Sequence, residues 1–296
     1  MSLSRDRDLA GAAAESLDDL LAVLRLEATG EDRFRIPAAA QDLFGRIYGG
    51  QLLAQALVGA ATTVEGKGVN SLHAAFVRVG APGRPVEVAV TRVRDGRSMA
   101  TREVTVLQDG APLLVAFASF HANSSVPDWQ TGAPGAPSPE ETPLIQDWAQ
   151  QAHQAGRRWI ERPPPVELRV PEAPIFLGGT GTSPTRSHWM RLPRPVEGDQ
   201  MLHAALLAYA SDMLLMDMVF RAHPGPLGNG LASGFSVDHA IWFHRPTRFD
   251  GWHLYTQEAV TVFGERGLTR GAIHDHAGRL VASVMQEVLV RPWTSR

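Results

Sequence analysis

The sequence has no cysteine, and lysine occurs once, at Lys67, although 28 of its 296 residues are basic. Without cysteine the chain has no disulfides, no iron–sulfur clusters, no cysteine-ligated zinc and no cysteine nucleophile. The 28 basic residues are balanced by 31 acidic ones, which leaves a net charge of −3. Proteins that bind nucleic acids need a basic surface to neutralise phosphates, so we expect no nucleic-acid partner.

Long hydrophobic runs are also missing. The longest apolar stretch, residues 213–220, contains Asp217 and is far shorter than the ~20 residues that a membrane-spanning helix needs. The first eight residues alternate in charge and lack the apolar segment of a signal peptide. The final residues, Thr294-Ser295-Arg296, differ from a peroxisomal Ser-Lys-Leu signal. These features predict a cytoplasmic protein with no membrane partner.

Several catalytic motifs are absent as well. The sequence has no Gly-x-Ser-x-Gly turn, no Walker A loop and no His-Glu-x-x-His. These absences argue against a serine enzyme of the α/β-hydrolase class, a P-loop nucleotidase and a zinc metalloprotease. A hydrophobic content of 44% is nevertheless ample for a packed core.

The residues that are present follow the same pattern twice. In the first part, an amphipathic helix is predicted over 16–26, and an apolar helical segment over 51–58 follows Gly49-Gly50 and precedes strands. Asp109-Gly110 is typical of a hairpin turn between two of these strands. In the second part, a long apolar helix is predicted over 200–220, again followed by strands. The predicted strands are 71–78, 85–94, 100–108 and 112–121, and then 231–245, 252–262, 268–274 and 279–291.

A proline-rich segment separates the two parts, with ten prolines between residues 123 and 174. Such density is typical of a linker, here with one short helix near 144–158. We therefore predict an N-terminal domain over 1–123, a linker over 124–175 and a C-terminal domain over 176–296.

Local sequence matches between the two parts indicate a duplication. His73-Ala-Ala-Phe76 parallels His239-Ala-Ile-Trp242, and Thr101-Arg102 parallels Thr269-Arg270, at offsets of 166 to 168 residues. Matches in a common order indicate two copies of one unit. Each copy is a long helix followed by antiparallel strands, which predicts an α+β fold of two tandem hotdog domains, a double hotdog.

One charged residue interrupts a helix face that should be apolar. Asp212 has no charged residue at the helical spacings of three and four, whereas Asp217 has Arg221 four residues later and is expected to form a helix ion pair with it. An unpaired carboxylate among apolar side chains is costly. Asp212 is therefore either functional, or it caps a helix break or binds a distant backbone amide.

Gln286 is a similar exception in a strand, because alternation places it on a face made otherwise of Ala and Val. Its amide needs hydrogen-bond partners, supplied by the core or by a site. Ser236 lies on a mixed strand face and is ordinary by pattern alone. Asp238 and His239 follow it, but successive strand residues point to opposite faces, so we do not predict a Ser–His–Asp triad.

Gly49-Gly50 stands before a helix. A helix start offers free backbone N–H groups and the positive end of the helix dipole, which suit a developing oxyanion. The same glycine pair is also a common way simply to begin a helix.

Twelve short segments carry a family resemblance. They are Tyr48-Gly-Gly-Gln51, Ser71-Leu-His-Ala-Ala-Phe76, Arg94-Asp-Gly96, Thr101-Arg102 and Ala118-Ser-Phe120 in the first part, and Tyr209-Ala-Ser-Asp212, Val237-Asp-His239, Trp242-Phe-His-Arg-Pro246, Arg266-Gly267, Arg270-Gly271, Val281-Ala-Ser283 and Gln286-Glu287 in the second. With these segments the sequence resembles the acyl-CoA thioesterase II (TesB-like) family of double-hotdog enzymes. The resemblance covers most of the chain outside the linker.

The resemblance implies hydrolysis of fatty acyl-CoA thioesters to free fatty acid and CoA by an activated water. The family's catalytic Asp, Thr and Gln map onto Asp212, Ser236 and Gln286, so serine stands where the family has threonine. Backbone N–H groups at Gly50 or Gln51 would bind the oxyanion. CoA belongs to the substrate, and no cofactor is implied. We expect a homo-oligomer, because hotdog sheets leave edges that need covering.

Three alternatives remain at this point. A hotdog enoyl-CoA hydratase would use an Asp/His pair, but the pattern places no histidine beside Asp212. A catalytically weak acyl-CoA-binding double hotdog would be consistent with the serine at position 236. A thioesterase could also act on a carrier other than CoA, or on a branched or polar acyl group.

Overall fold

The computed structural model describes residues 2–37, 45–122, 128–223 and 233–291. Its helices are α1 (Ser2–Val23), α2 (Gly49–Ala61), α3 (Ile145–Gln151), α4 (Arg157–Glu161), α5 (Gln200–Ser211) and α6 (Leu215–Ala222), with a 3-10 turn η1 (Ile175–Leu177). Its strands are β1 (Glu27–Gly30), β2 (Arg33–Ile36), β3 (Gly68–Phe76), β4 (Val86–Asp95), β5 (Met99–Gln108), β6 (Ala111–His121), β7 (Glu167–Arg169), β8 (Thr185–Arg191), β9 (Ser233–Ser236), β10 (Asp238–Phe243), β11 (His253–Phe263), β12 (Arg266–Asp275) and β13 (Leu280–Arg291).

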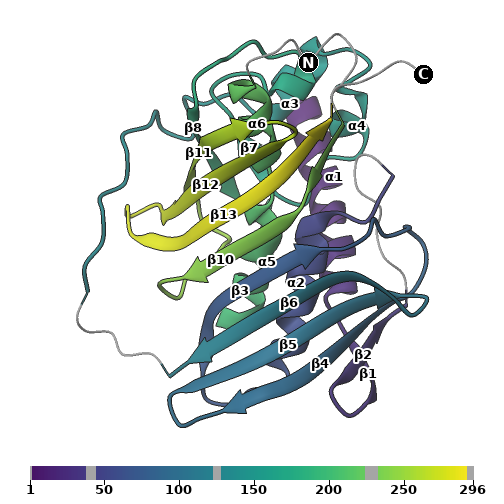
Figure 1. Cartoon of the computed structure of the whole chain (residues 1–296). Coiled ribbons are helices and arrows are strands. Elements are labelled where there is room, and N and C mark those ends of the chain that lie inside the picture. Colours follow the sequence, from purple (N-terminus) through teal and green to yellow (C-terminus); the bar gives the residue numbers. More distant parts are fainter. Residues whose placement is uncertain (1, 38–44, 123–127, 224–232, 292–296) are drawn as a thin grey trace.

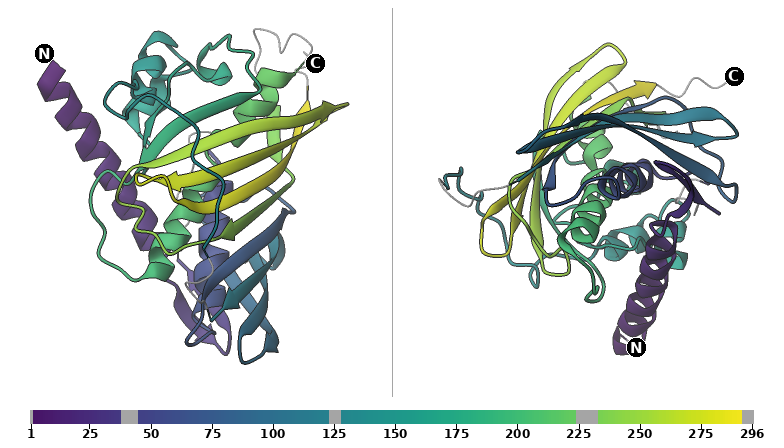
Figure 2. Two further views of the ribbon diagram at one scale, coloured as in Figure 1. Left: turned by 90° about the vertical axis from the view of Figure 1, so that its left-hand side faces the viewer. Right: turned by 90° about the horizontal axis from the view of Figure 1, so that it is seen from below.

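The strands form one antiparallel sheet in the order β1-β2-β4-β5-β6-β3-β10-β13-β12-β11-β8-β7, and β9 pairs with β13 outside this path. The first six strands come from the N-terminal part, and the two parts meet where β3 pairs with β10. The sheet curves around α2 and α5, which pack against each other (Figures 1 and 2). Because a helix enclosed by antiparallel strands occurs twice, the predicted α+β double hotdog is confirmed.

Local chemistry explains these elements. The helix α2 is apolar on all sides because it lies between the sheet and α5, and its residues from Gly50 to Leu57 are all buried. The side chain of Asp199 caps α5 by accepting the backbone N–H of Leu202 at 2.9 Å. Asp109 and Gly110 both have positive φ, at 50° and 75°, as a tight hairpin turn between β5 and β6 requires. The hairpin prediction is therefore confirmed.

Several elements differ from the prediction. Helix α1 begins at Ser2, fourteen residues before the predicted start, and β1, β2 and β8 were not predicted. The proline-rich segment holds α3, which lies within the short helix predicted near 144–158. It also holds α4 and β7, and β7 pairs with β8 in the sheet. Figure 2 shows α1 lying against the open side of the curved sheet, with its N-terminal end pointing away from the body.

The apolar segment Gln200–Ala222 is long and apolar enough to cross a membrane, but 89% of its 18-residue apolar stretch is buried inside the protein. It forms α5 and α6, which are core helices. The prediction of one continuous helix over 200–220 is wrong, because the chain breaks between Ser211 and Leu215.

The predicted strand 231–245 is also interrupted. Ser236 of β9 pairs with Val288, and Ala240 of β10 pairs with Met285. Three residues therefore lie between these pairs on one strand and two on the other, which places one extra residue, a β-bulge, near Val237. The bulge reverses the alternation of side chains between β9 and β10.

The sequence match between His73 and His239 is out of register with the structure. His239 is only 1% exposed, and its partner across the β3–β10 ladder is Ala74. His73, one residue earlier, is on the outer face, where its ring lies 5.0 Å from that of Trp242. Neighbouring strand residues face opposite sides of the sheet. Aligning His73 with His239 therefore matches an outward-facing residue with an inward-facing one, so this alignment of the two repeats is wrong by one residue.

Candidate active site

The break between α5 and α6 presents Asp212. This residue is the C-cap of α5, and Leu214 adopts a left-handed conformation (φ 63°) before α6 begins. A non-glycine residue rarely adopts positive φ, so tertiary contacts must hold this turn. Asp212 is 9% exposed, and it lies between the two parts of the protein, close to the beginning of α2.

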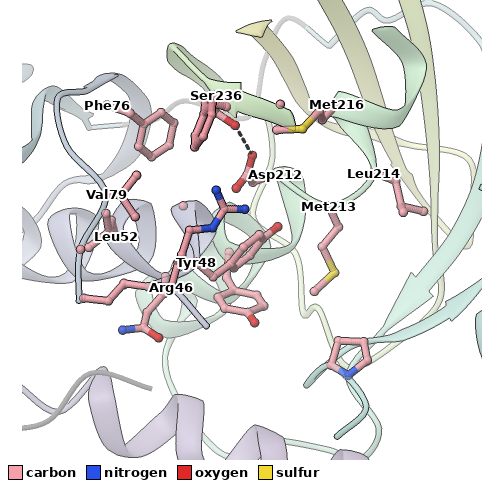
Figure 3. Close-up of a pocket in the computed structure, with 18 of the residues that line it drawn as sticks. Arg46, Tyr48, Leu52, Phe76, Val79, Asp212, Met213, Leu214, Met216 and Ser236 are labelled. Atoms are coloured by element: carbon pink, nitrogen blue, oxygen red, sulfur yellow. Dashed lines mark hydrogen bonds between the residues drawn. The ribbon is translucent and has the colours of Figure 1, made fainter. Parts of the chain in front are cut away.

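Donors from both parts surround the carboxylate of Asp212. The hydroxyl of Ser236 donates to Oδ1 at 3.5 Å (Figure 3). The side-chain amide of Gln286 and the backbone N–H of Gly50 also donate to this carboxylate. A Cβ atom at Gly49 would lie 2.7 Å from Oδ2, so glycine is needed there for the approach. The carboxylate thus occupies the N-terminus of α2, where an anion is favoured.

A hydrogen-bond chain extends behind this carboxylate. Gln286 Nε2 donates to the Ser236 hydroxyl at 3.0 Å, and Gln286 Oε1 lies 2.5 Å from His239 Nδ1. Nε2 must face Asp212 because only the NH2 end of an amide can donate to a carboxylate. Oε1 therefore faces His239, whose Nδ1 carries the proton. The other ring nitrogen, Nε2, lies 2.9 Å from the Ser211 hydroxyl.

A cavity of about 630 Å³ opens onto Asp212 and Ser236. Most of its walls are apolar, and α1, α2, the α5–α6 break and the proline-rich segment all contribute. Arg46 lies at the cavity in Figure 3, with its guanidinium 5.3 Å from the ring centre of Phe235. The apolar lining includes Leu20, Tyr48, Leu52, Phe76, Trp159, Phe176, Tyr209, Met213, Met216 and Phe220. The size and lining suit a small molecule with a substantial apolar part.

Models of known protein families match both parts of the chain. A family model described as "Acyl-CoA thioesterase N-terminal domain" matches residues 39–121, and one described as "Acyl-CoA thioesterase C-terminal domain" matches residues 131–290. The chain belongs to the acyl-CoA thioesterase family. The second match begins at residue 131, inside the proline-rich segment.

Individual members of the acyl-CoA thioesterase family are similar over nearly the whole chain. Human acyl-coenzyme A thioesterase 8 is 33% identical, over 91% of this chain and 88% of the human protein. Acyl-CoA thioesterase 2 of Haemophilus influenzae is 30% identical, over 94% of this chain and 99% of that protein. The crystal structure of an acyl-CoA thioesterase II from Mycobacterium marinum is 32% identical with a TM-score of 0.76, over 93% and 99% of the two chains.

Burial shifts the pKa values of two titratable groups at this site, Asp212 and His239, in opposite directions. Burial raises the pKa of Asp212 above its ordinary value, although the nearby His239 and the donors Gln286, Gly50 and Ser236 oppose the shift. Burial lowers the pKa of His239, and the carboxylate of Asp212 opposes that shift. Asp212 is consequently a stronger base than an exposed aspartate, and His239 favours its neutral form.

The structure brings the three predicted catalytic side chains together, although Asp212, Ser236 and Gln286 come from different elements. Gly50 and Gln51 lie at the same place, at the start of α2. Their backbone N–H groups already have acceptors, namely the Asp212 carboxylate and, at 3.1 Å, the carbonyl oxygen of Tyr48. The role of these two N–H groups as oxyanion donors stays a prediction.

His239 is the residue that the strand pattern missed. The expectation that no histidine lies beside Asp212 is wrong, because the β-bulge turns His239 to the same side as Ser236. Asp238 does not join them: it is exposed, and its carboxylate accepts the backbone N–H of Glu287 at 2.8 Å. The sequence signals for His239 were the internal match with His73 and the Asp-His pair within the family resemblance, and neither places it beside Asp212.

The expected ion pair between Asp217 and Arg221 is also corrected. Asp217 pairs with Arg186 at 2.6 Å, with both side chains fully buried, and accepts the backbone N–H of Ile175 at 2.7 Å. Arg221 pairs with Glu172 instead. Within the described ranges, no group of three His, Asp or Glu side chains is placed to hold a metal ion.

Proposed function

We propose that the protein hydrolyses fatty acyl-CoA thioesters to free acid and CoA, with a water molecule activated by Asp212. One observation carries the proposal: a buried carboxylate lies at the wall of a largely apolar cavity, hydrogen-bonded to Ser236, Gln286 and the N-terminus of α2. The apolar walls would hold the acyl chain, and the carboxylate would face the thioester carbonyl.

The reaction follows from these groups. The carboxylate of Asp212 takes a proton from water while the water oxygen attacks the carbonyl carbon. The tetrahedral intermediate then collapses, the C–S bond breaks, and the electron pair leaves on sulfur. The CoA thiolate then takes up the proton that Asp212 accepted, which restores the carboxylate. Because thiols ionise at about pH 8.5, the departure of the thiolate needs no strong acid. Ser236 and Gln286 hold the carboxylate and the water in the geometry of attack.

The oxyanion donor that we propose is the side chain of Gln51 rather than its backbone N–H. Gln51 lines the cavity and is 3% exposed, and its Nε2 has no hydrogen-bond partner among the described residues. A buried amide without a partner is costly, and a thioester oxygen would satisfy it. The positive end of the α2 dipole would add to the stabilisation.

A hydratase is the competing enzyme, and the position of His239 beside Asp212 is the observation in its favour. Both ring nitrogens of His239 are, however, committed to Ser211 and Gln286. One assay series separates the possibilities. Purified protein is incubated with saturated acyl-CoAs of graded chain length, and free thiol is measured, while loss of the conjugated double bond is followed with a 2-enoyl-CoA. Thiol release supports the proposal, and double-bond loss without thiol release contradicts it, as does tight binding with neither reaction.

We also propose that the protein self-associates through the outer face of the sheet. Two large apolar side chains are exposed there, Phe117 (49%) and Trp242 (36%). His73 joins them, because it pairs with Phe117 across the ladder and its ring contacts Trp242. Light scattering should show an oligomer that Trp242→Arg weakens. A monomeric wild-type protein would contradict this proposal.

A further inference from the structure

Two buried side chains of β11 hold the backbone on either side of Asp212. The phenol of Tyr255 donates to the carbonyl oxygen of Ser211 at 2.7 Å. Gln257 Nε2 donates to the carbonyl oxygen of Met213, also at 2.7 Å. Both side chains are 0% exposed. Asp212 lies between the two bonded carbonyls, so β11 holds the peptide unit directly before Asp212 and the unit between Met213 and Leu214.

These carbonyls need partners because the helix stops. The last carbonyls of a helix have no intrahelical N–H to accept, and here the helix ends among buried residues, with Ser211 0% and Met213 8% exposed, so the freed carbonyls need other donors. The left-handed conformation of Leu214 (φ 63°) turns the chain away from the axis of α5. Tyr255 and Gln257 supply the missing donors, and so they favour the broken helix over a continuous one.

Tyr255 is itself fixed by the neighbouring strands. A Cβ atom on Gly271 of β12 would lie 2.4 Å from Tyr255 Cε2, so the ring occupies the space that glycine leaves. On the other side, the ring of His188 of β8 has its centre 5.3 Å from that of Tyr255. The phenol is therefore a rigid donor, aimed from the sheet at the end of α5.

We propose that Tyr255 and Gln257 are positioning residues for the thioesterase reaction: they hold the α5–α6 break in the conformation that places the Asp212 carboxylate against Gly50 and Ser236. Neither residue is among those that line the cavity, so they act through Asp212 and not on the substrate. The inference rests on the proposed function for its kinetic readout, and on backbone dynamics for a readout that does not depend on activity.

The chain offers a matched control for the test. Gln55 on α2 is also 0% exposed, its Nε2 donates to the backbone carbonyl of Val23 at 3.2 Å, and its Oε1 lacks a partner, as does that of Gln257. Tyr255→Phe, Gln257→Met and Gln55→Met therefore each remove one buried hydrogen bond to a carbonyl. Only the first two bonds lie beside Asp212.

We expect Tyr255→Phe and Gln257→Met to lower kcat by about tenfold with KM within about twofold of wild type. Gln55→Met should lose a similar amount of Tm with kcat unchanged. Hydrogen exchange at residues 208–216 should accelerate in the first two variants and not in the control. Unchanged kcat and unchanged local exchange in both variants would overturn the inference, as would a loss of kcat in Gln55→Met equal to theirs. If wild-type protein releases no thiol, the proposed function fails, and the exchange data alone decide whether β11 holds the break.

Discussion

The carboxylate of Asp212, at the end of α5, accepts a hydrogen bond from the backbone N–H of Gly50, at the beginning of α2. The two central helices belong to different halves of the chain, so a single contact joins both hotdog units at the site. Burial disfavours the charged form of this carboxylate, while the N-terminus of α2 and the side-chain amide of Gln286 stabilise the charged form. The balance keeps the carboxylate ionisable and more basic than one in water.

The raised pKa of Asp212 predicts how activity depends on pH. The base must be ionised to accept a proton, so kcat/KM should fall as the pH decreases through the folded-state pKa of Asp212. Burial raises that pKa, so the acid limb should lie above the value of about 4 that exposed aspartates show. The measurement is a kcat/KM profile on the best acyl-CoA. An acid limb at or below pH 4 would contradict the assignment.

The raised pKa of Asp212 also predicts how the stability of the folded protein changes with pH. Since the pKa is higher in the folded state than in the unfolded state, folding favours the protonated carboxyl. This stabilisation is fully present below about pH 4 and is lost as the pH rises through the folded-state pKa. Asp212→Asn mimics the protonated form, so its Tm should exceed that of wild type at pH 7, and the difference should shrink on acidification.

A second aspartate provides the control for that experiment. Burial raises the pKa of Asp217 as well, although Arg186 opposes the shift. Asp217→Asn should nevertheless lower Tm at pH 7, because, unlike Asp212→Asn, it leaves a buried guanidinium, that of Arg186, without its ion-pair partner. A Tm loss of similar size in both variants would mean that Asp212 is a structural ion-pair partner like Asp217.

The value of kcat/KM should depend on the presence of a hydroxyl at position 236 more than on whether serine or threonine carries it. Ser236 donates to Asp212 and accepts from Gln286, so Ser236→Ala should lower kcat/KM by about fivefold or more, as expected for the loss of about 1 kcal/mol. Ser236→Thr keeps the hydroxyl and should be neutral or faster, unless the added methyl clashes. Ser71→Ala, which removes a hydroxyl pair with Ser119, is the control. Equal kcat/KM in wild type and Ser236→Ala would show that Ser236 is a bystander.

His239 should affect turnover without affecting substrate binding. Its Nδ1 proton orients the amide of Gln286, and it is not among the residues that line the cavity. His239→Leu removes this donor and should reduce kcat by about tenfold, with KM nearly unchanged. His239→Asn, whose side-chain NH2 can occupy a place close to Nδ1, should recover part of the loss. A change confined to KM would instead place His239 in substrate binding.

The side chain of Gln51 should stabilise the transition state. Loss of one oxyanion donor typically lowers kcat by about 100-fold or more, and Gln51→Met should show a decrease of that order. Gln55→Met, one turn later on the same helix, should keep wild-type kcat. If Gln51→Met is as active as Gln55→Met, another group binds the oxyanion.

The sequence indicated the site best where a polar residue interrupted an apolar pattern. Asp212 and Gln286 are exceptions on otherwise apolar faces, and Gln286 indeed lies on the buried face of β13, 1% exposed. The pattern also recovered α2, the beginning of α5 at Gln200 and the hairpin at Asp109-Gly110, but not the end of α5. These features are local, so alternation and turn chemistry are enough to predict them.

The features that the sequence did not reveal depend on tertiary contacts. The helix break passes through Leu214, which is not a glycine, so no residue type signals its positive φ. The bulge near Val237 shifts the strand faces by one residue, and this shift is what brings His239 beside Asp212. From the sequence, Tyr255 and Gln257 cannot be distinguished from ordinary strand residues. Their hydrogen-bond partners are backbone carbonyls more than 40 residues away, which no local pattern indicates.

Thiol release by Asp212→Asn tests most directly whether Asp212 activates the water. The substitution preserves the shape of the side chain and removes its basicity, so we expect a loss of kcat/KM of about 100-fold or more in a protein that remains folded at the assay temperature. Acyl-CoA hydrolysis is measured for wild type and variant side by side, with Tm recorded for both. A folded Asp212→Asn protein that keeps more than about a third of wild-type activity would contradict the central claim, because the water would then be activated by another group.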